Sequence, residues 1–155
     1  MDAPQSTGPT ADRSDGDSRL ESLTSDECMA LLATQPVARL GVVVGEYPVV
    51  IPVAISLDHG VVVLRSGARS TLTAAQHANV TVQADQIDPV TRTGWSVLVR
   101  GLAEQVTDQH SAAVVERSHR AAADPWAPGG RQHWVRVIPH RVTGRRLIGK
   151  GPAEV

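Results

Sequence analysis

Short apolar runs separated by turn residues recur along most of the chain, and several alternate apolar with polar positions. A period of two predicts strands with one buried face. Strands are expected over residues 37–44, 47–57, 60–65, 79–85, 94–106 and 133–138, with 141–148 as a short seventh. Tight turns join neighbouring runs, which favours antiparallel pairing. The pattern therefore predicts a mainly β protein whose six or seven antiparallel strands form a barrel.

Helical patterns flank the predicted strands. Thr24 is followed three residues later by Glu27, which is the spacing of a capping box. We expect this helix to end near Thr34, before Pro36. A second helix is expected to start at a cap at Asp108 or Ser111 and to run to about residue 122. A short helical stretch covers residues 72–77, so the predicted fold is mainly β with flanking helices.

Prolines and a glycine interrupt two of the predicted strands. Pro48 and Pro52 lie within one run, and proline cannot donate to a strand ladder. That strand is therefore expected at a sheet edge, or bulged. Gly101 interrupts the long run over 94–106 and predicts a bulge or a close backbone approach.

Composition sets the limits of the prediction. Valine occurs 22 times and phenylalanine is absent, which suits strands better than a helical bundle. The net charge of −1 and the four aromatic residues argue against nucleic acid as a partner. The single cysteine, Cys28, permits no intrachain disulfide and favours a cytoplasmic location. No apolar run is long enough to span a membrane, so no membrane association is expected.

The ends of the chain differ from its middle. Residues 1–21 are rich in Asp, Ser, Gly and Pro, and we expect a disordered tail. Residues 22–149 form the predicted domain, and residues 150–155 form a short C-terminal tail.

A strand-to-helix turn carries the first candidate chemistry. It holds two arginines, a glycine and hydroxyl side chains just before a short helix, a combination that suits a phosphate. The candidate residues are Arg65, Ser66, Gly67, Arg69, Ser70, Thr71 and Leu72. From this turn alone, solvated arginines in a polar loop are the simpler interpretation.

Two further clusters could complete a pocket for a flat aromatic cofactor with a phosphate tail. Pro52, Val53 and Ala54 would present the backbone of an edge strand to a ring. Trp95 would lie beside the ring, and Ser96 could hydrogen-bond to it. The alternative is that Trp95 is a core residue in a protein without phenylalanine.

Other motifs predict no catalytic group. The six histidines show no metal-binding spacing, so no metal site is expected. His77 is the first candidate for a haem ligand, against the simpler interpretation of a helix-end histidine. Residues 144–151 come close to a phosphate-binding loop but lack its final Ser or Thr. The catalytic residues stay unknown.

In order and spacing, these clusters resemble the FMN-binding split-barrel proteins similar to pyridoxamine 5′-phosphate oxidase, in particular their small actinobacterial-type branch. The resemblance covers residues 23–148. The residues that carry it are Gly41, 52–54, 65–67, 70–72, Asp85, 94–97, 100–101, Ala103, 125–127 and 144–146. It implies a split barrel and a homodimer with FMN at the subunit interface.

The resemblance also implies residue roles. Arg65, Ser66, Ser70 and Thr71 would face the FMN phosphate. Residues 52–54 would border the isoalloxazine, and residues 95–96 would complete the pocket from either subunit. Such proteins commonly have Lys where this chain has Thr71, so one phosphate-binding charge is missing, and Arg69 is the candidate to replace it.

The function expected from the resemblance is an FMN-dependent oxidoreductase acting on an unknown small molecule. A deazaflavin coenzyme is the alternative cofactor. A second hypothesis is a flavin-, deazaflavin- or haem-binding sensor without turnover. A third is a dimeric scaffold whose site has decayed.

Overall fold

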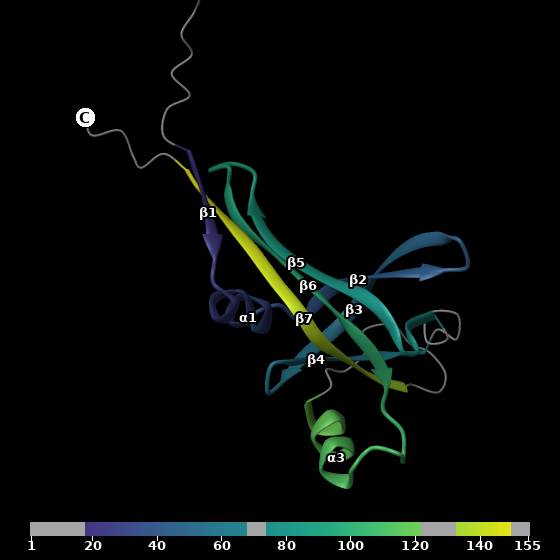
Figure 1. The fold of residues 1–155 in the computed structure, drawn as a ribbon. Helices are drawn as coiled ribbons and strands as arrows, with labels where there is room; N and C mark the ends of the chain where they lie inside the picture. Colours follow the sequence, from purple (N-terminus) through teal and green to yellow (C-terminus); the bar gives the residue numbers. More distant parts are fainter. Residues whose placement is uncertain (1–17, 68–73, 122–132, 150–155) are drawn as a thin grey trace, which may run out of the picture.

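The computed structural model describes residues 18–67, 74–121 and 133–149, which form seven strands and two helices (Figure 1). In chain order the elements are β1 (Arg19–Leu23), α1 (Ser25–Ala33), β2 (Val37–Val44), β3 (Tyr47–Asp58), β4 (Val61–Ser66), β5 (Ala78–Asp88), β6 (Thr93–Gln105), α3 (Ala112–Ala121) and β7 (His133–Ile148).

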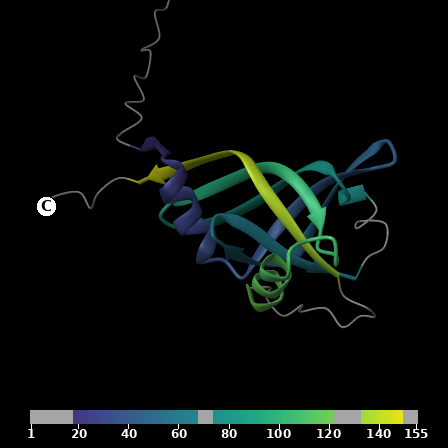
Figure 2. The same cartoon turned by 60° about the horizontal axis from the view of Figure 1, so that its bottom comes forward.

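The strands form a closed ring with one strand added outside it. Their order is β1-β7-β4-β3-β2-β5-β6, and β6 also pairs with β7. Every pairing is antiparallel. Six strands therefore close into a barrel, and β1 extends the sheet beside β7, which confirms the predicted fold class (Figure 2).

Strand β7 links the two ends of the molecule. Its first residues pair with β4, its last residues pair with β1, and nearly its whole length pairs with β6. The two separate strands predicted over 133–138 and 141–148 are therefore one strand. The register places Gly101 opposite Pro139 and Arg100 opposite Arg141, which leaves His140 as the extra residue of a β-bulge. The bulge accounts for what the sequence pattern had shown as a break.

Inward-facing aliphatic side chains fill the barrel. Leu40 and Val42 on β2 alternate with exposed neighbours, as do Val97 and Val99 on β6. Helix α1 buries Cys28 and Leu32 against this core. The core is thus built from small β-branched residues, as the valine-rich composition indicated.

The capping box of α1 is confirmed. The Glu27 backbone N–H donates to the Thr24 hydroxyl at 3.3 Å, and the Thr24 backbone N–H donates to the Glu27 carboxylate at 2.8 Å. Of the two predicted caps for α3, Ser111 accepts a hydrogen bond from the Val114 N–H at 3.4 Å. Only residues 74–77 of the predicted short helix are described.

Two predicted boundaries are wrong. The tail expected over residues 1–21 overlaps β1, where Arg19 pairs with Ile148 and Leu23 with Gly144. The predicted strands over 79–85 and 94–106 are too short, because β5 continues to Asp88, where it pairs with Thr93 at the end of a hairpin. Both segments are polar or exposed, so their strand pairing leaves little hydrophobic signal. Residues 1–17 and 150–155 lie outside the described part.

Within the described ranges, neither helix is long and apolar enough to cross a membrane.

Candidate functional site

Among the described residues, the half of β3 that contains the two prolines is an open edge. Within that part of the chain, residues 47–54 pair only with β2, because β4 pairs with β3 from Ile55 onward. The Ile55 N–H donates to the Pro36 carbonyl at 3.1 Å, which directs Ile55 toward β2. Alternation along the strand then directs the backbone of Pro48, Pro52 and Ala54 toward the open side. The prolines thus cost no ladder hydrogen bond, and the predicted edge is confirmed.

Two of the three predicted clusters meet where β3 and β4 separate. Ile55 pairs with Leu64, so Ala54 and Arg65 are the first residues beyond the last paired ones. Pro52 is exposed, whereas the side chains of Val53 and Ala54 are buried. Residues 52–54 therefore offer backbone groups. Half-buried Arg65 lies near the end of β4, and exposed Gly67 directly follows that strand.

Arg65 rests on an aromatic platform that the sequence analysis did not single out. Its guanidinium carbon lies 5.0 Å from the centroid of the Trp134 ring. On α3, the His119 ring lies 4.0 Å from the same indole, with the two planes tilted by 34°. A cation over an indole is an attractive, orienting contact. Trp134 and α3 therefore fix the orientation of the Arg65 side chain near the end of β4.

A buried ion pair attaches α3 to the barrel. Arg136 on β7 donates from Nη1 to Asp58 Oδ2 at 2.8 Å and to Ser118 Oγ at 2.8 Å. Asp58 and Arg136 are 6% and 8% exposed. The hydrogen bond from Arg136, followed by that with His59, lowers the pKa of Asp58 to about 2. Asp58, which follows the strand predicted over residues 47–57, is therefore a structural anion.

The third predicted cluster, Trp95 and Ser96, lies at the opposite end of the barrel from Arg65. Arg65 is opposite Trp134 on β7, and Trp95 is opposite Arg146. These partners are twelve residues apart on β7, about 40 Å at the rise of a strand. The Trp95 side chain is 9% exposed and packs in the core, while Ser96 is exposed. One chain therefore does not bring Trp95 and Ser96 to Arg65.

The comparisons with known proteins identify the family of this chain. The family model for pyridoxamine 5′-phosphate oxidase matches residues 24–146. The chain belongs to this family. An uncharacterized protein of Mycobacterium tuberculosis, Rv0080, is 32% identical over 132 residues, which cover 81% of this chain and 84% of the relative.

Solved structures of the pyridoxamine 5′-phosphate oxidase family share the fold. The FAD binding protein from Mycobacterium smegmatis is 32% identical with a TM-score of 0.68, covering 81% of this chain and 98% of that one. A putative pyridoxamine 5′-phosphate oxidase from Corynebacterium glutamicum is 24% identical with a TM-score of 0.70, covering 87% and 98%. The resemblance expected from the sequence is confirmed, and so is the split-barrel fold.

Several residues expected from the family pattern lie outside the described ranges. These are Arg69, Ser70, Thr71, Leu72 and residues 125–127, together with the side chain of Ser66. His77 is described; it is exposed and has a φ of 51°. In the described ranges, no three His, Cys, Asp or Glu side chains gather to hold a metal ion.

The described part of the site fits a phosphate-bearing flat ring. Arg65 supplies a fixed cation, and Gly67 leaves the backbone open to close approach. The open edge at Pro52 and Ala54 supplies backbone groups for the polar edge of a ring. Trp134 could have been suspected from the sequence, because three of the four aromatic residues are tryptophan. Its contact with Arg65 depends on the β4–β7 register, which no local pattern reveals.

Proposed function

We propose that this chain is a flavin-binding redox protein of the pyridoxamine 5′-phosphate oxidase family. The observation that carries the proposal is the position of Arg65, which lies over Trp134 and directly follows Leu64, the last β4 residue paired with β3, where the open β3 edge begins. The flavin phosphate would contact Arg65, and the polar edge of the isoalloxazine would meet the backbone near Ala54. The Mycobacterium smegmatis relative, which matches along most of its length, is named a FAD binding protein and supports a flavin.

FMN is the cofactor proposed from the sequence, and FAD is its direct rival. Both carry a phosphoryl group that suits Arg65, and the solved relative favours FAD. A deazaflavin coenzyme and haem remain as alternatives; a FAD and haem binding protein from Mycobacterium smegmatis shares the fold at 16% identity. The test below separates all four by spectrum and mass.

We further propose a homodimer with the cofactor between subunits. Trp95 and Ser96 lie about 40 Å along β7 from the partner of Arg65, too far for one flavin to contact both within a chain. If residues 95–96 complete the pocket, they do so from a second copy. Each barrel would then carry two half-sites at opposite ends, one at Arg65 and one at Trp95 and Ser96.

In this proposal the flavin supplies the electron or hydride transfer, and the protein binds and orients it. Arg65 would neutralise the phosphate, and the β3 edge would fix the ring. Thr71, where related proteins commonly have lysine, favours a second candidate, a flavin-binding sensor without turnover. Reduction of the bound flavin by NADH, NADPH or a reduced deazaflavin would distinguish an oxidoreductase from such a sensor.

The experiment is the visible spectrum of the purified protein, followed by mass spectrometry of the released cofactor. The proposal expects the two flavin absorption bands and the mass of FMN or FAD. A Soret band would point to haem, and a deazaflavin mass to the alternative coenzyme. Colourless protein that also fails to take up added FMN or FAD would refute flavin binding.

A further inference from the structure

The indole of Trp134 contacts a titratable side chain as well as Arg65. The ring centroid of His119 on α3 lies 4.0 Å from that of the indole, and the Arg65 guanidinium carbon lies 5.0 Å from the indole centroid. Because both distances start from one ring, His119 and Arg65 are at most about 9 Å apart, close to the Debye length of about 8 Å at physiological ionic strength. A charge on His119 therefore acts on an anion bound at Arg65.

The barrel fixes the position of His119 on this ring. Ser118, the residue before it, is fully buried and accepts a hydrogen bond from Arg136 Nη1 at 2.8 Å. Arg136 is itself held by Asp58. His119 is exposed, so it can exchange a proton with solvent while α3 keeps its ring on the indole.

His119 differs from two other histidines in its partners. His59 contacts the Asp58 carboxylate, and His110 contacts the Glu104 carboxylate. Within the described residues, no carboxylate forms a hydrogen bond or an ion pair with His119. A proton that His119 takes up is therefore not neutralised by a described carboxylate.

The nearby carboxylates have cationic partners of their own. Asp58, with a pKa of about 2, stays ionised at neutral pH and pairs with Arg136, while Glu116 on α3 pairs with exposed Arg120. The described charged or titratable side chains on α3, on the turn before it and on the nearby parts of β3, β4, β6 and β7 are Asp58, His59, Arg65, Glu104, Asp108, His110, Glu116, Arg117, Arg120, His133 and Arg136.

His133 is the other histidine next to Trp134, and it points away from Arg65. It lies opposite Ser66, and its Nδ1 accepts a hydrogen bond from the Gln105 side-chain amide at 2.9 Å. Successive residues of a strand point to opposite faces, so His133 lies on the other face of β7 from Trp134. His119 is therefore the described histidine that shares the face of Arg65.

We propose that His119 takes up a proton together with the flavin phosphate, so that flavin affinity rises as the pH falls through the histidine range. This inference rests on the proposed function, which places that phosphate at Arg65. The protonated imidazole attracts the phosphate anion, and by reciprocity the bound anion favours the protonated imidazole. Histidine changes its charge between about pH 5 and 8, so the site holds its cofactor more tightly in mild acid than in mild base.

The test measures the Kd of the cofactor-free full chain for FMN and FAD from about pH 8.5 to about pH 5.5, at low ionic strength to reduce screening. His119→Phe keeps a ring against the indole and cannot take up a proton. The ratio of the variant's Kd to that of the wild type should rise about threefold to tenfold as the pH falls. Ionisation of the flavin phosphate itself cancels in this ratio.

Proton uptake is a second readout. Calorimetric titration in two buffers of different ionisation enthalpy should show that the wild type takes up more protons on flavin binding than His119→Phe does. His119→Gln, a neutral replacement without an aromatic ring, should lose the same proton uptake. Because His119 is exposed, both variants are expected to fold, and thermal melting checks this.

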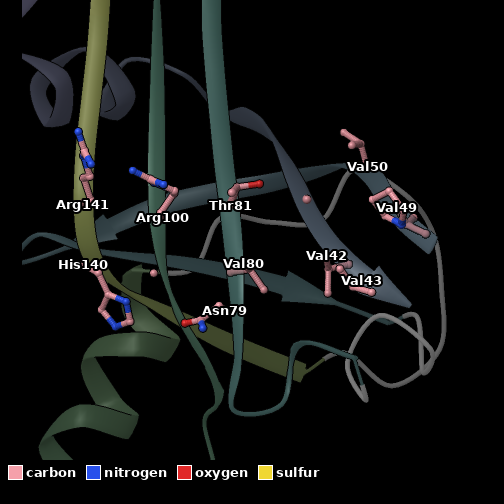
Figure 3. A pocket seen from close by; sticks show the side chains of 13 residues that line it. Val42, Val43, Val49, Val50, Asn79, Val80, Thr81, Arg100, His140 and Arg141 are labelled. Carbon is pink, nitrogen blue, oxygen red and sulfur yellow. The ribbon is translucent and has the colours of Figure 1, made fainter. Parts of the chain in front are cut away.

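Riboflavin and His140→Gln are the controls. Riboflavin lacks the phosphate, so its Kd ratio should stay constant with pH. His140 is also exposed, but it lies six residues from Trp134 along β7, about 20 Å, and lines a different pocket together with Val80 and Arg100 (Figure 3). His140→Gln should keep the pH profile of the wild type.

Flavin binding with one pH profile in the wild type and both His119 variants overturns the coupling and leaves the proposed function standing. An equal change of the Kd ratio with riboflavin also overturns it, because the phosphate is then not the partner of the proton. If neither FMN nor FAD binds at any pH, the proposed function fails and the coupling fails with it.

Discussion

At the scale of single residues, the described site depends on two charges fixed by neighbours far away in sequence. Arg65 is oriented by Trp134, and Asp58 is held by Arg136, which lies 78 residues later in the chain on β7. The sequence pointed to Arg65 because a cation before a glycine-containing turn is a local signal. It could not point to Asp58 as a buried group, since a turn aspartate is usually solvated.

Replacing Asp58 should change the acid stability of the protein. Its folded-state pKa of about 2 lies below the ordinary 3.8, so the ionised carboxylate stabilises the fold. This stabilisation is complete above about pH 5 and is lost as the pH falls toward 2. Asp58→Asn leaves the buried Arg136 without its anion and should cost about 3 kcal/mol at pH 7. Urea unfolding between pH 2 and 7 measures both effects.

The matched control is Glu46→Gln, in the exposed turn between β2 and β3. It should unfold with the pH profile of the wild type. If Asp58→Asn also shows that profile, the ion pair does not contribute as described.

Trp134 should be important for flavin affinity through its ring rather than its N–H. The indole N–H is buried without an acceptor in the described part of the chain, so Trp134→Phe loses no hydrogen bond. Trp134→Leu removes the aromatic face beneath Arg65 and should weaken flavin binding by about 1 kcal/mol, or about fivefold. Fluorescence titration with flavin measures the affinity of the Phe and Leu variants. Equal affinities of the Phe and Leu variants would argue against the platform.

At the scale of elements, features that depend on residues close in sequence are predictable, and pairings between distant strands are not. The capping box of α1 and the proline-marked edge of β3 depend on residues close in sequence, and both are confirmed. The continuity of β7 depends on its pairing with β6, so residues 139–140 were interpreted as a gap between strands. Strand β1 is polar and exposed, so nothing in its own composition distinguished it from a tail.

Gly101→Ala should destabilise the β6–β7 pair. Its new methyl group would lie 2.3 Å from the Ile138 carbonyl oxygen, a backbone atom that can move only with the bulge. We expect a loss of about 1–3 kcal/mol in the free energy of unfolding, measured by urea denaturation. Gly45→Asn is the control, because Gly45 has a φ of 63° that asparagine tolerates and no atom within 4 Å. A similar loss of unfolding free energy in both variants would show that the close approach of β7 does not depend on Gly101.

At the scale of the whole molecule, the barrel separates the two halves of the expected pocket. The sequence predicted the family and its residues, yet distances between clusters emerge only when the strands close into a ring. Closure places the Arg65 end and the Trp95 end far apart along β7. A shared site between two copies follows from this separation if both ends contact the flavin.

Subunit mixing tests the shared site. Arg65→Ala and Ser96→Ala homodimers should each bind flavin weakly. In a mixed dimer, one site carries both changes and the other carries neither, so random exchange should restore about a quarter of the sites to wild-type affinity. Flavin titration before and after exchange measures this. Exposed Ser96 is the better choice than core Trp95, because its replacement should not unfold the barrel. No recovery despite exchange would show that each site lies within one chain.

The central claim is that Arg65 binds the phosphate of a flavin whose ring lies at the β3 edge. Equilibrium titration of the cofactor-free protein with FMN and FAD tests it most directly. The account predicts saturable binding of at least one flavin by the wild type and by Arg120→Gln. It predicts a loss of about 1.5–3 kcal/mol in Arg65→Ala, which is about a tenfold to hundredfold weaker affinity. Wild-type protein that binds neither flavin, or an Arg65→Ala variant that binds as tightly as the wild type, would contradict it.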